Sequence, residues 1–393
     1  MHIVFVNYYS LACNSGGHLL NLASALSKHG VTSSIFVPFA PEAVPLPNDD
    51  SQMACHSFDH LDKWFASYSP GLEQTLIVAW TPRENVRNFV SRLRSRLPCR
   101  YVVHLEDNEI LITAMHLGLE PDELRRLTES QLAAIIAPDA RLSHPIYSAQ
   151  FLAQSHGVTA LMDTLGGALP PAHPVHVFWP GADAAFFNVG PIDYPRRRAL
   201  GIADEELVLA YTGNVHPMNQ KEVRSLYLAI SILQRRGIPA RLIRTGEDHV
   251  PIFSHDIPEV NRHIVHLGRL PAVTDVANVL ALANFLVQPG CSDLFNDYRF
   301  PSKLPEFFAS GRPVLLPGAN LGRFVRDGKD AQVLKRGDGL EISENLARLA
   351  AQPAISLELG AAARAFAHIH FRWSAIANGI LTFYKSMLSQ PTP

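Results

Sequence analysis

The chain has few cysteines and no cysteine pattern typical of a disulfide framework or a zinc site. Its 393 residues include 4 cysteines, at positions 13, 55, 99 and 291, and no two of them form a C-x-x-C pair. This spacing argues against a disulfide-stabilised fold and against a structural metal centre. It fits the reducing environment of the cytoplasm, where we expect the protein to be located.

Charge of one sign and long apolar runs are also lacking. Lys and Arg number 34, Asp and Glu number 36, and the net charge is -2, so we expect no nucleic-acid partner. No stretch approaches the roughly 20 apolar residues of a membrane span. The N-terminus, MHIVFVNYYS, lacks the basic segment and the long apolar run of a signal peptide. We expect a soluble protein, with peripheral membrane contact and oligomeric state left open.

Apolar residues make up 47% of the chain, which is enough for the two domains that its length predicts. Short β-rich runs alternate with segments in which Leu and Ala recur at helical spacing. In the first half, the runs HIVFV, VTSSIFVP, TLIVAW and YVVHLE are predicted strands. The alternation predicts βαβ units and a parallel sheet in an α/β fold.

The texture changes over residues 184–206, which contain two prolines and the run PRRR and are the best candidate for a linker. The alternation then restarts with LVLAYTG, ARLIRTG, HIVHLG, NFLVQPG and AQVLKR, which predicts a second doubly wound domain. Ligands of such sheets bind at the carboxyl ends of the strands. The loops that follow the predicted strands are therefore the places to look for a site.

The loop after NFLVQPG carries charge just ahead of the apolar run VLLP. Ser302 is a plausible N-cap and Pro305 suits a first helical turn, which would place Lys303 and Glu306 in that turn and Gly311 at its end. A helix start with Lys303 and the preceding Arg299 suits a phosphate or diphosphate, and a carboxylate one turn further suits a ribose diol. The alternative is a solvated helix start with a weak i,i+3 charge pair.

Several stretches in order resemble the GT-B glycosyltransferases, especially those of family 4. PSKLPEFFASGRPV is similar to their donor-site motif, often written PEAMACGxPV. SGGHLLNLASALSKHG, WPGAD followed by FF, YTGNVHPMN, HLGRLP and ANFLVQPG resemble their other segments over nearly the whole chain. The resemblance implies two Rossmann-like domains that face a cleft, with a C-terminal helix that crosses back to the first domain.

The resemblance also implies a function for each part. Residues 1–185 would bind the acceptor, residues 186–371 would bind the nucleotide sugar, and residues 372–393 would form the returning helix, held by Trp373, Phe383 and Tyr384. The expected reaction moves a sugar from a UDP- or GDP-linked donor to a hydroxyl of a glycan, lipid-linked or small-molecule acceptor. Retention of configuration, no metal and no cofactor beyond the donor are expected.

The sequence departs from the family pattern at the donor motif. Glu306 matches the second glutamate of the family's E-x7-E motif, which holds the ribose, but Tyr298 stands in place of the first. Asn214 stands where an arginine is common, with Asn219 or Lys221 near the usual lysine. We therefore expect Arg299 and Lys303 to bind the diphosphate.

Two loops of the first domain carry further candidates. Gly16 and Gly17 open a helix beside His18, and glycines there allow backbone N–H groups to approach a ligand; the loop lacks G-x-G-x-x-G, so no dinucleotide fingerprint is predicted. HLEDNE, at residues 104–109, ends a strand, and Asp107 or Glu106 could take a proton from an acceptor hydroxyl. The alternatives are a tight turn for the first loop, and an acidic helix start or a metal site for the second.

The candidates form two groups. The catalytic candidates are Asp107, Glu106, His18 and Lys303. The donor-binding candidates are Gly16, Gly17, Gly213, Asn214, His266, Gly268, Gly290, Asn296, Arg299, Lys303 and Glu306. The rivals to a transferase are an epimerase or a phosphorylase of the same fold, or a noncatalytic nucleotide-sugar-binding or scaffold protein, for which the loss at Tyr298 is the only support.

Overall fold

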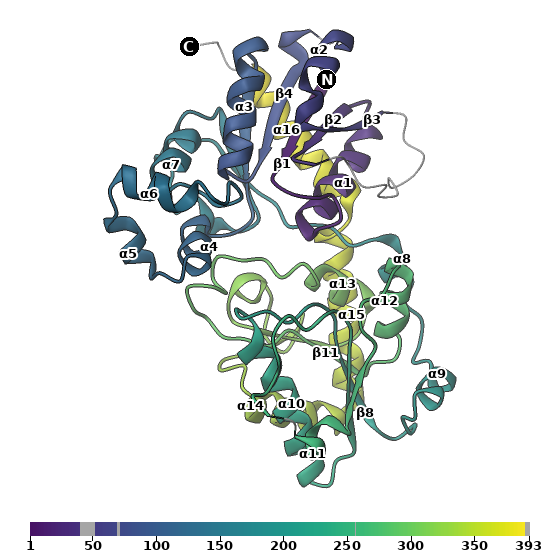
Figure 1. Cartoon of the computed structure of the whole chain (residues 1–393). Helices are drawn as coiled ribbons and strands as arrows, with labels where there is room; N and C mark the ends of the chain where they lie inside the picture. The colour runs from purple at the N-terminus through teal and green to yellow at the C-terminus, as the bar shows by residue number, and fades with distance from the viewer. Residues whose placement is uncertain (40–51, 69–70, 256, 390–393) are drawn as a thin grey trace. The chain divides into compact units, whose positions relative to one another are not determined.

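The computed structural model describes residues 1–39, 52–68, 71–255 and 257–389 (Figure 1). The chain divides into two compact units. The first comprises residues 1–181, 298–300 and 373–393, and the second comprises residues 182–297 and 301–372. Each unit is built on its own parallel sheet.

The first unit contains a seven-stranded sheet in the order β3-β2-β1-β4-β5-β6-β7, with every neighbouring pair parallel. The strands are β1 His2–Asn7, β2 Thr32–Val37, β3 Met53–Ser57, β4 Thr75–Trp80, β5 Arg100–Leu105, β6 Gly157–Ala160 and β7 Val175–Val177. All residues of β1 and β4 are buried, which explains why both strands are almost continuously apolar. The strand order reverses at β1 and β4, and parallel sheets of this kind bind ligands at that point.

Helices connect these strands. They are α1 Asn14–Ser27, α2 Leu61–Ser67, α3 Glu84–Arg96, α4 Glu109–His116, α5 Pro121–Arg126, α6 Glu129–Ile136 and α7 Pro145–Ala153. Helices α4 to α7 lie between β5 and β6 and share a small core that includes Ala114, Leu124 and Leu132. Capping boxes begin α5 and α6, so the short length of both helices is partly offset by satisfied end groups.

The C-terminal helix α16, Trp373–Ser389, belongs to the first unit and packs against α1 and β4 (Figure 1). A Cβ atom on Gly157 of β6 would lie 2.6 Å from Met387 Sδ and 2.9 Å from Phe383 Cζ, so this glycine lets the helix approach the sheet. Tyr384 is fully buried. These contacts confirm the predicted return of the last helix to the N-terminal domain.

The second unit contains a six-stranded parallel sheet in the order β10-β9-β8-β11-β12-β13. The strands are β8 Leu207–Tyr211, β9 Ala240–Arg244, β10 Ile264–His266, β11 Phe285–Val287, β12 Val314–Pro317 and β13 Gln332–Leu334. The helices are α8 Ala184–Phe187, α9 Tyr194–Ala199, α10 Gln220–Arg235, α11 Pro258–Asn261, α12 Val273–Leu280, α13 Leu304–Ser310, α14 Gly339–Ala350 and α15 Pro353–His370. The predicted pair of doubly wound α/β domains is confirmed.

The predicted linker, residues 184–206, is folded rather than open, because it contains α8 and α9. Arg197 is fully buried and donates to Leu282 O at 2.8 Å, just after the end of α12. Arg312 donates to Gly190 O at 2.8 Å and to Ala281 O at 3.1 Å. Arginines at a helix C-terminus satisfy its last carbonyls, so these two side chains hold the segment against the C-terminal end of α12.

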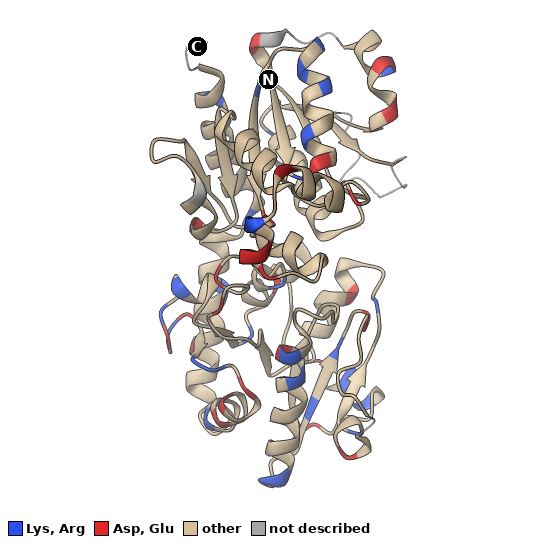
Figure 2. Cartoon of the chain, turned by 60° about the vertical axis from the view of Figure 1, so that its left-hand side comes forward, with Lys and Arg blue, Asp and Glu red and all other residues tan. Residues whose placement is uncertain are grey.

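Figure 2 shows lysine, arginine, aspartate and glutamate spread over the helices and loops of both units. This distribution matches the near-balanced formal charge of -2. Among the residues that the structure describes, no helix has the length and apolar character needed to cross a membrane.

Candidate functional site

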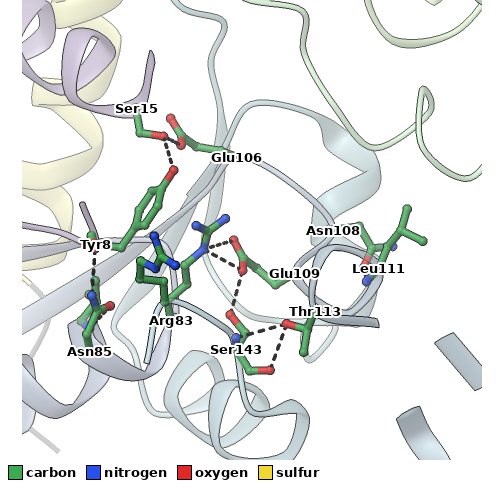
Figure 3. A network of polar contacts seen from close by, with 12 residues as sticks. Tyr8, Ser15, Arg83, Asn85, Glu106, Asn108, Glu109, Leu111, Thr113 and Ser143 are labelled. Atoms are coloured by element: carbon green, nitrogen blue, oxygen red, sulfur yellow. Dashed lines mark hydrogen bonds and ion pairs between the residues drawn. The ribbon is translucent and has the colours of Figure 1, made fainter. Parts of the chain in front are cut away.

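Glu106 follows β5 and belongs to a buried polar network in the first unit, in which Figure 3 shows it next to Ser15. Its Oε1 accepts a hydrogen bond from Trp80 Nε1 at 3.0 Å, and its Oε2 accepts one from the Ser15 hydroxyl. His18 Nδ1 lies 3.4 Å from Oε1. The strand ends of β4 and β5 and the first turn of α1 therefore meet at this carboxylate.

This environment fixes Glu106 in its ionised form. Burial alone would raise the pKa of its carboxyl, but the hydrogen bond and charge of His18 and the Ser15 donor outweigh burial and lower the pKa to about 2. A carboxylate with such a pKa is a weak base near neutral pH. Of the two predicted proton acceptors, Glu106 is thus the less suitable, and its geometry suits the positioning of Ser15 and His18.

Asp107, the next residue, has the opposite electrostatics. Burial raises its pKa to about 7, assisted by the nearby charges of Glu106 and Glu109, while Arg83 and Arg299 oppose the shift. Within the described part of the chain, its carboxyl makes no hydrogen bond, and the side chain is only partly buried. A partly accessible carboxyl that titrates near neutral pH is suited to accept a proton from a hydroxyl.

An ion pair supports this edge of the sheet from the side of α4. Arg83 Nε lies 3.1 Å from Glu109 Oε2, and Ser143 Oγ donates to the same oxygen at 2.7 Å (Figure 3). The guanidinium of Arg83 also lies 3.8 Å from the ring centroid of Tyr8, whose hydroxyl is 3.4 Å from Ser15 Oγ. The two carboxylates, Glu106 and Glu109, are thus joined through Ser15, Tyr8 and Arg83.

Thr81, between β4 and α3, adopts a strained backbone conformation. Its φ of 77° is rare for a β-branched residue, and its side chain is almost fully buried. Its hydroxyl is buried, and neither it nor Asn7 Oδ1 at the end of β1 has a hydrogen-bond partner among the described residues. Strain and unsatisfied polar atoms of this kind gather at functional sites.

The amides of Gly16 and Gly17 in the first loop are not free, although the sequence led us to expect that they could approach a ligand. The amide of Gly17 donates to Cys13 O at 2.9 Å, and that of Gly16 donates to Cys13 Sγ at 3.4 Å. A Cβ on Gly16 would lie 2.5 Å from Leu11 backbone atoms, whereas one on Gly17 would meet nothing within 4 Å. Gly16 is therefore required for packing, and of the loop only the side chains of Ser15 and His18 reach the network around Glu106.

In the second unit, Lys303 lies beside the end of β8. Its Nζ is 3.0 Å from the hydroxyl of Tyr211 and 4.1 Å from the centroid of that ring. Gly213 has a φ of 125°, and a Cβ there would lie 3.2 Å from Lys303 Nζ. Gly213 and Lys303, two of the donor-binding candidates 90 positions apart in the sequence, are thus brought together by the strand end and the loop before α13.

The loops after β8, β9 and β10 pack closely through glycines. A Cβ on Gly246 would lie 2.5 Å from the carbonyl of Gly213, and the amide of Gly246 donates to Gly268 O at 2.8 Å. His266 Nε2 lies 3.0 Å from Gly246 O. Asn214 Oδ1 accepts from the amide of Glu247 at 2.9 Å, so this oxygen organises the loop.

Asn296 and Gly290 both pack against Glu222 and so stabilise the loop that follows β11. Asn296 is fully buried, and its Nδ2 donates to Glu222 Oε1 at 2.6 Å. A Cβ on Gly290, whose φ is 131°, would lie 2.9 Å from the same Glu222 oxygen. The side chain of Asn296 is therefore committed to Glu222, and a donor contact by Asn296 stays a prediction.

The helix of the donor motif begins one residue later than predicted. Lys303, not Ser302, is the N-cap of α13, and Glu306 lies in its first turn. Burial raises the pKa of Glu306 to about 8, although Lys303 opposes the shift. Gly311 closes the helix with a φ of 71°, as predicted.

Arg299 belongs with the first unit, together with Tyr298 and Phe300, whereas Lys303 belongs with the second. The ring of Phe300 stacks on Trp179 at 6.1 Å. The positive charge of Arg299 opposes the rise in the pKa of the Asp107 carboxyl. Joint binding of a diphosphate by Arg299 and Lys303 stays a prediction.

The alternative of a metal site at residues 104–109 has no geometric support. The described residues contain no group of three or more His, Cys, Asp and Glu side chains placed to hold a metal ion. The carboxylates of Glu106 and Glu109 instead face hydrogen-bond donors and an arginine.

Comparison with known proteins identifies the architecture. No protein-family model matches the chain. Among solved structures, HepE of Anabaena in complex with UDP superposes with a TM-score of 0.68 at 15% identity, over 98% of this chain and 100% of that one. The chain has the GT-B fold.

Further GT-B structures agree. The sucrose-phosphate synthase of Thermosynechococcus elongatus has a TM-score of 0.68 at 15% identity, and a glycosyltransferase of Rickettsia africae has a TM-score of 0.71 at 10% identity; each match covers 99% of both chains. The chain is also 24% identical over 224 residues to a D-inositol 3-phosphate glycosyltransferase of Rhodococcus erythropolis. That match spans about half of the relative, 48% of its length.

From the sequence we did not single out several residues of the network in the first unit. Ser15, Trp80, Arg83 and Glu109 all contact the network around the carboxylates. Ser15 stands in the loop that was singled out, and Glu109 in the acidic stretch, so both had a local signal. For Trp80 and Arg83 the sequence contained no signal other than their position at or just after the end of a predicted strand.

Proposed function

We propose that this GT-B chain is a glycosyltransferase that moves a sugar from a nucleoside diphosphate sugar to a hydroxyl acceptor. The observation that carries the proposal is the position of Lys303, next to Gly213 at the carboxyl end of β8. A departing diphosphate needs positive charge and close backbone approach, and this pair supplies both. HepE, a protein of the same fold, was solved with UDP and with UDP-glucose, which favours a uridine nucleotide over a guanosine nucleotide.

Glu306 would bind the ribose of the donor. A carboxyl whose pKa is about 8 is mostly protonated at neutral pH, so it can donate one hydrogen bond and accept another. A ribose diol offers both an acceptor and a donor, and therefore matches this group. Asp107 would accept a hydrogen bond or a proton from the acceptor hydroxyl, and the reaction would proceed with retention and without a bound metal.

The test is thermal unfolding with UDP, GDP, ADP and the corresponding nucleotide sugars, in the wild type and in Lys303→Ala. A ligand at 100 times its dissociation constant should stabilise the fold by roughly 2.7 kcal/mol. We expect stabilisation by one nucleotide, its loss in Lys303→Ala and its retention in Lys329→Ala, which removes an exposed lysine of the same unit. Lack of stabilisation by every nucleotide would overturn the donor-site assignment.

Turnover separates an enzyme from a noncatalytic binder. Release of the free nucleotide from the donor that binds should be measurable in the wild type and lost in Glu306→Ala. A wild-type protein that binds the donor tightly but never releases its nucleotide, with or without acceptors, would favour a binding protein instead.

A further inference from the structure

Two exposed aromatic side chains of the first unit form a corner, which is defined here as Tyr9 and Phe39. Tyr9 follows β1 and Phe39 follows β2, and these adjacent parallel strands end at the same edge of the sheet. Their ring centroids are 6.1 Å apart and their planes meet at 88°. Tyr9 is 37% exposed and Phe39 is 59% exposed, so both rings present area to solvent.

The backbone at Tyr9 is held in place by hydrogen bonds from two asparagine side chains. Asn7, which is fully buried, donates from Nδ2 to Tyr9 O at 3.0 Å. Asn85 Nδ2 donates to Tyr8 O at 2.8 Å, so the carbonyls of two consecutive residues are fixed by amide side chains. A loop fixed in this way loses little freedom when a ligand binds, which favours recognition.

The corner is continuous with the carboxylate network. Tyr9 stacks on Tyr8 with ring centroids 6.4 Å apart. The hydroxyl of Tyr8 lies 3.4 Å from Ser15 Oγ, and Ser15 donates to Glu106, the residue before Asp107. A molecule on the corner therefore lies on the same edge of the sheet as the carboxyl that titrates near neutral pH.

Polar groups next to the corner are paired rather than free. The guanidinium of Arg141 lies 5.5 Å from the Tyr9 ring centroid. It donates to Asp139 through Nε at 2.8 Å and through Nη2 at 2.7 Å. Such a pair is close to neutral as a whole, but it still offers donors and acceptor lone pairs to a ligand.

We propose that Tyr9 and Phe39 form the acceptor subsite and that its occupant is a pyranose ring of a glycan. A pyranose has an apolar C–H face and a rim of hydroxyls, so one ring of the corner contacts the face and the other contacts the edge. The Arg141–Asp139 pair meets the hydroxyls. An anionic lipid surface would instead favour unpaired cations and a wider apolar area than two rings supply.

This assignment rests on the proposed function, because it places the glycan at the same edge of the sheet as Asp107, which follows β5. It deepens that function by choosing a glycan among the acceptor classes. The donor site lies in the other unit, so donor binding and glycan binding can be measured separately.

The experiment is saturation-transfer NMR with methyl glycosides of glucose, galactose and mannose and with myo-inositol. Its variants are the wild type, Tyr9→Phe, the double variant Tyr9→Leu/Phe39→Leu, and Tyr194→Leu. The last removes a tyrosine that is 40% exposed and lies 5.4 Å from an arginine, but in the second unit. Thermal stabilisation by the nucleotides is recorded on the same samples.

We expect saturation of the C–H protons of at least one pyranoside in the wild type, Tyr9→Phe and Tyr194→Leu. In the double variant, affinity should fall by about tenfold, the combined effect of two aromatic contacts. No transfer to any pyranoside, or an affinity in the double variant equal to that of the wild type, overturns the subsite. Sedimentation with phosphatidylglycerol vesicles that is lost in the double variant also overturns it, in favour of a lipid surface.

The outcomes for the two proposals differ. Nucleotide stabilisation that survives in the double variant while glycan affinity falls about tenfold supports both. Glycan binding without stabilisation by any nucleotide leaves the subsite standing and overturns the transferase. Nucleotide stabilisation without glycan binding overturns the subsite and leaves the proposed transferase standing.

Discussion

Lys303 Nζ lies 3.0 Å from the hydroxyl of Tyr211 and 4.1 Å from the centre of its ring. Tyr211 is the last residue of β8 and is almost fully buried, so its hydroxyl is a fixed point at the carboxyl edge of the second sheet. The ring and the hydroxyl together restrict a side chain that is otherwise among the most mobile. The charge that a diphosphate would meet is thereby held in place before any ligand arrives.

The first prediction concerns that restraint. Tyr211→Phe removes the hydroxyl but keeps the ring, and we expect nucleotide affinity to fall roughly two- to tenfold, as the loss of one hydrogen bond implies. Tyr211→Leu removes both contacts and should weaken binding further. Titration calorimetry with the stabilising nucleotide measures the change.

Tyr101→Phe is the matched control for Tyr211. It removes another buried tyrosine hydroxyl, which donates to Phe151 O at 2.7 Å in the first unit. We expect it to lower thermal stability and to leave nucleotide affinity unchanged. Equal affinity in wild type and Tyr211→Leu would show that Tyr211 has no part in placing Lys303.

The second prediction concerns the pH dependence of transfer. Burial, with Glu106 and Glu109 nearby, raises the pKa of Asp107 to about 7, and only the ionised form can accept a proton. The value of kcat/KM should therefore fall about tenfold per pH unit below pH 7. Asp107→Asn should lower the rate by roughly 10²- to 10⁴-fold and remove this limb from the profile.

Glu106 provides the contrast on the same strand end. Its pKa of about 2 lies below the assay range, so Glu106→Gln should lower activity through displaced Ser15 and His18. It should keep the limb that belongs to Asp107 but move it to lower pH, because the Glu106 charge that helps to raise the pKa of Asp107 is removed. A limb near pH 7 that persists in Asp107→Asn would exclude Asp107 as the titrating group.

The third prediction concerns stability against pH. Asp107 has a pKa of about 7 in the folded chain and an ordinary value of 3.8, so between these pH values the folded state holds a proton that the unfolded state has released. Stability from this group is therefore greatest below about pH 4 and falls as the pH rises to 7. Glu306, raised from 4.5 to about 8, acts in the same direction.

Amide variants should reveal this cost. The amide side chains in Asp107→Asn and Glu306→Gln cannot ionise. The free energy of unfolding of each variant should therefore exceed that of the wild type by at least ~1 kcal/mol at pH 8 and equal it near pH 4. Asp122→Asn, at an aspartate side chain 76% exposed on α5, should show no such trend. Unfolding by urea across pH 4–8 measures the differences. Wild-type stability that does not fall above pH 5 relative to these variants would contradict the assigned pKa shifts.

The sequence predicted the sheets and their edges well, because buried parallel strands must be nearly all apolar. The short apolar runs TLIVAW and LVLAY, each followed by turn residues, have the length of buried strands rather than of helices. It also located Gly213 and Asp107 on strand-end loops, and Lys303 and Glu306 at the start of the helix after β11. Their residue types are unusual beside buried strands, and that contrast is visible without a structure.

Contacts between distant segments could not be predicted in the same way. Asn296 appeared free to meet a donor, but its partner is Glu222, 74 positions away on α10. The amides of Gly16 and Gly17 appeared available, but Cys13 accepts from both. The separation of Asp107 from Glu106, two adjacent carboxyls with opposite pKa shifts, depends on which donors the fold brings to each.

The last prediction concerns Gly246, on which the loops after β8, β9 and β10 depend. Its φ is 96°, and a Cβ would lie 2.5 Å from the backbone carbonyl of Gly213, which cannot move without displacing the strand end beside Lys303. Gly237 has a similar φ of 74° but nothing within 4 Å of its Cβ position, so Gly237→Ala isolates the cost of the left-handed backbone, about 1–2 kcal/mol. Gly246→Ala should cost roughly 3 kcal/mol or more, because overpacking adds to that strain, and should abolish stabilisation by nucleotide. Urea unfolding and nucleotide titration of both variants measure the two effects. Equal losses in the two variants, with nucleotide binding intact in both, would mean that the close packing of Gly246 on Gly213 does not shape the site.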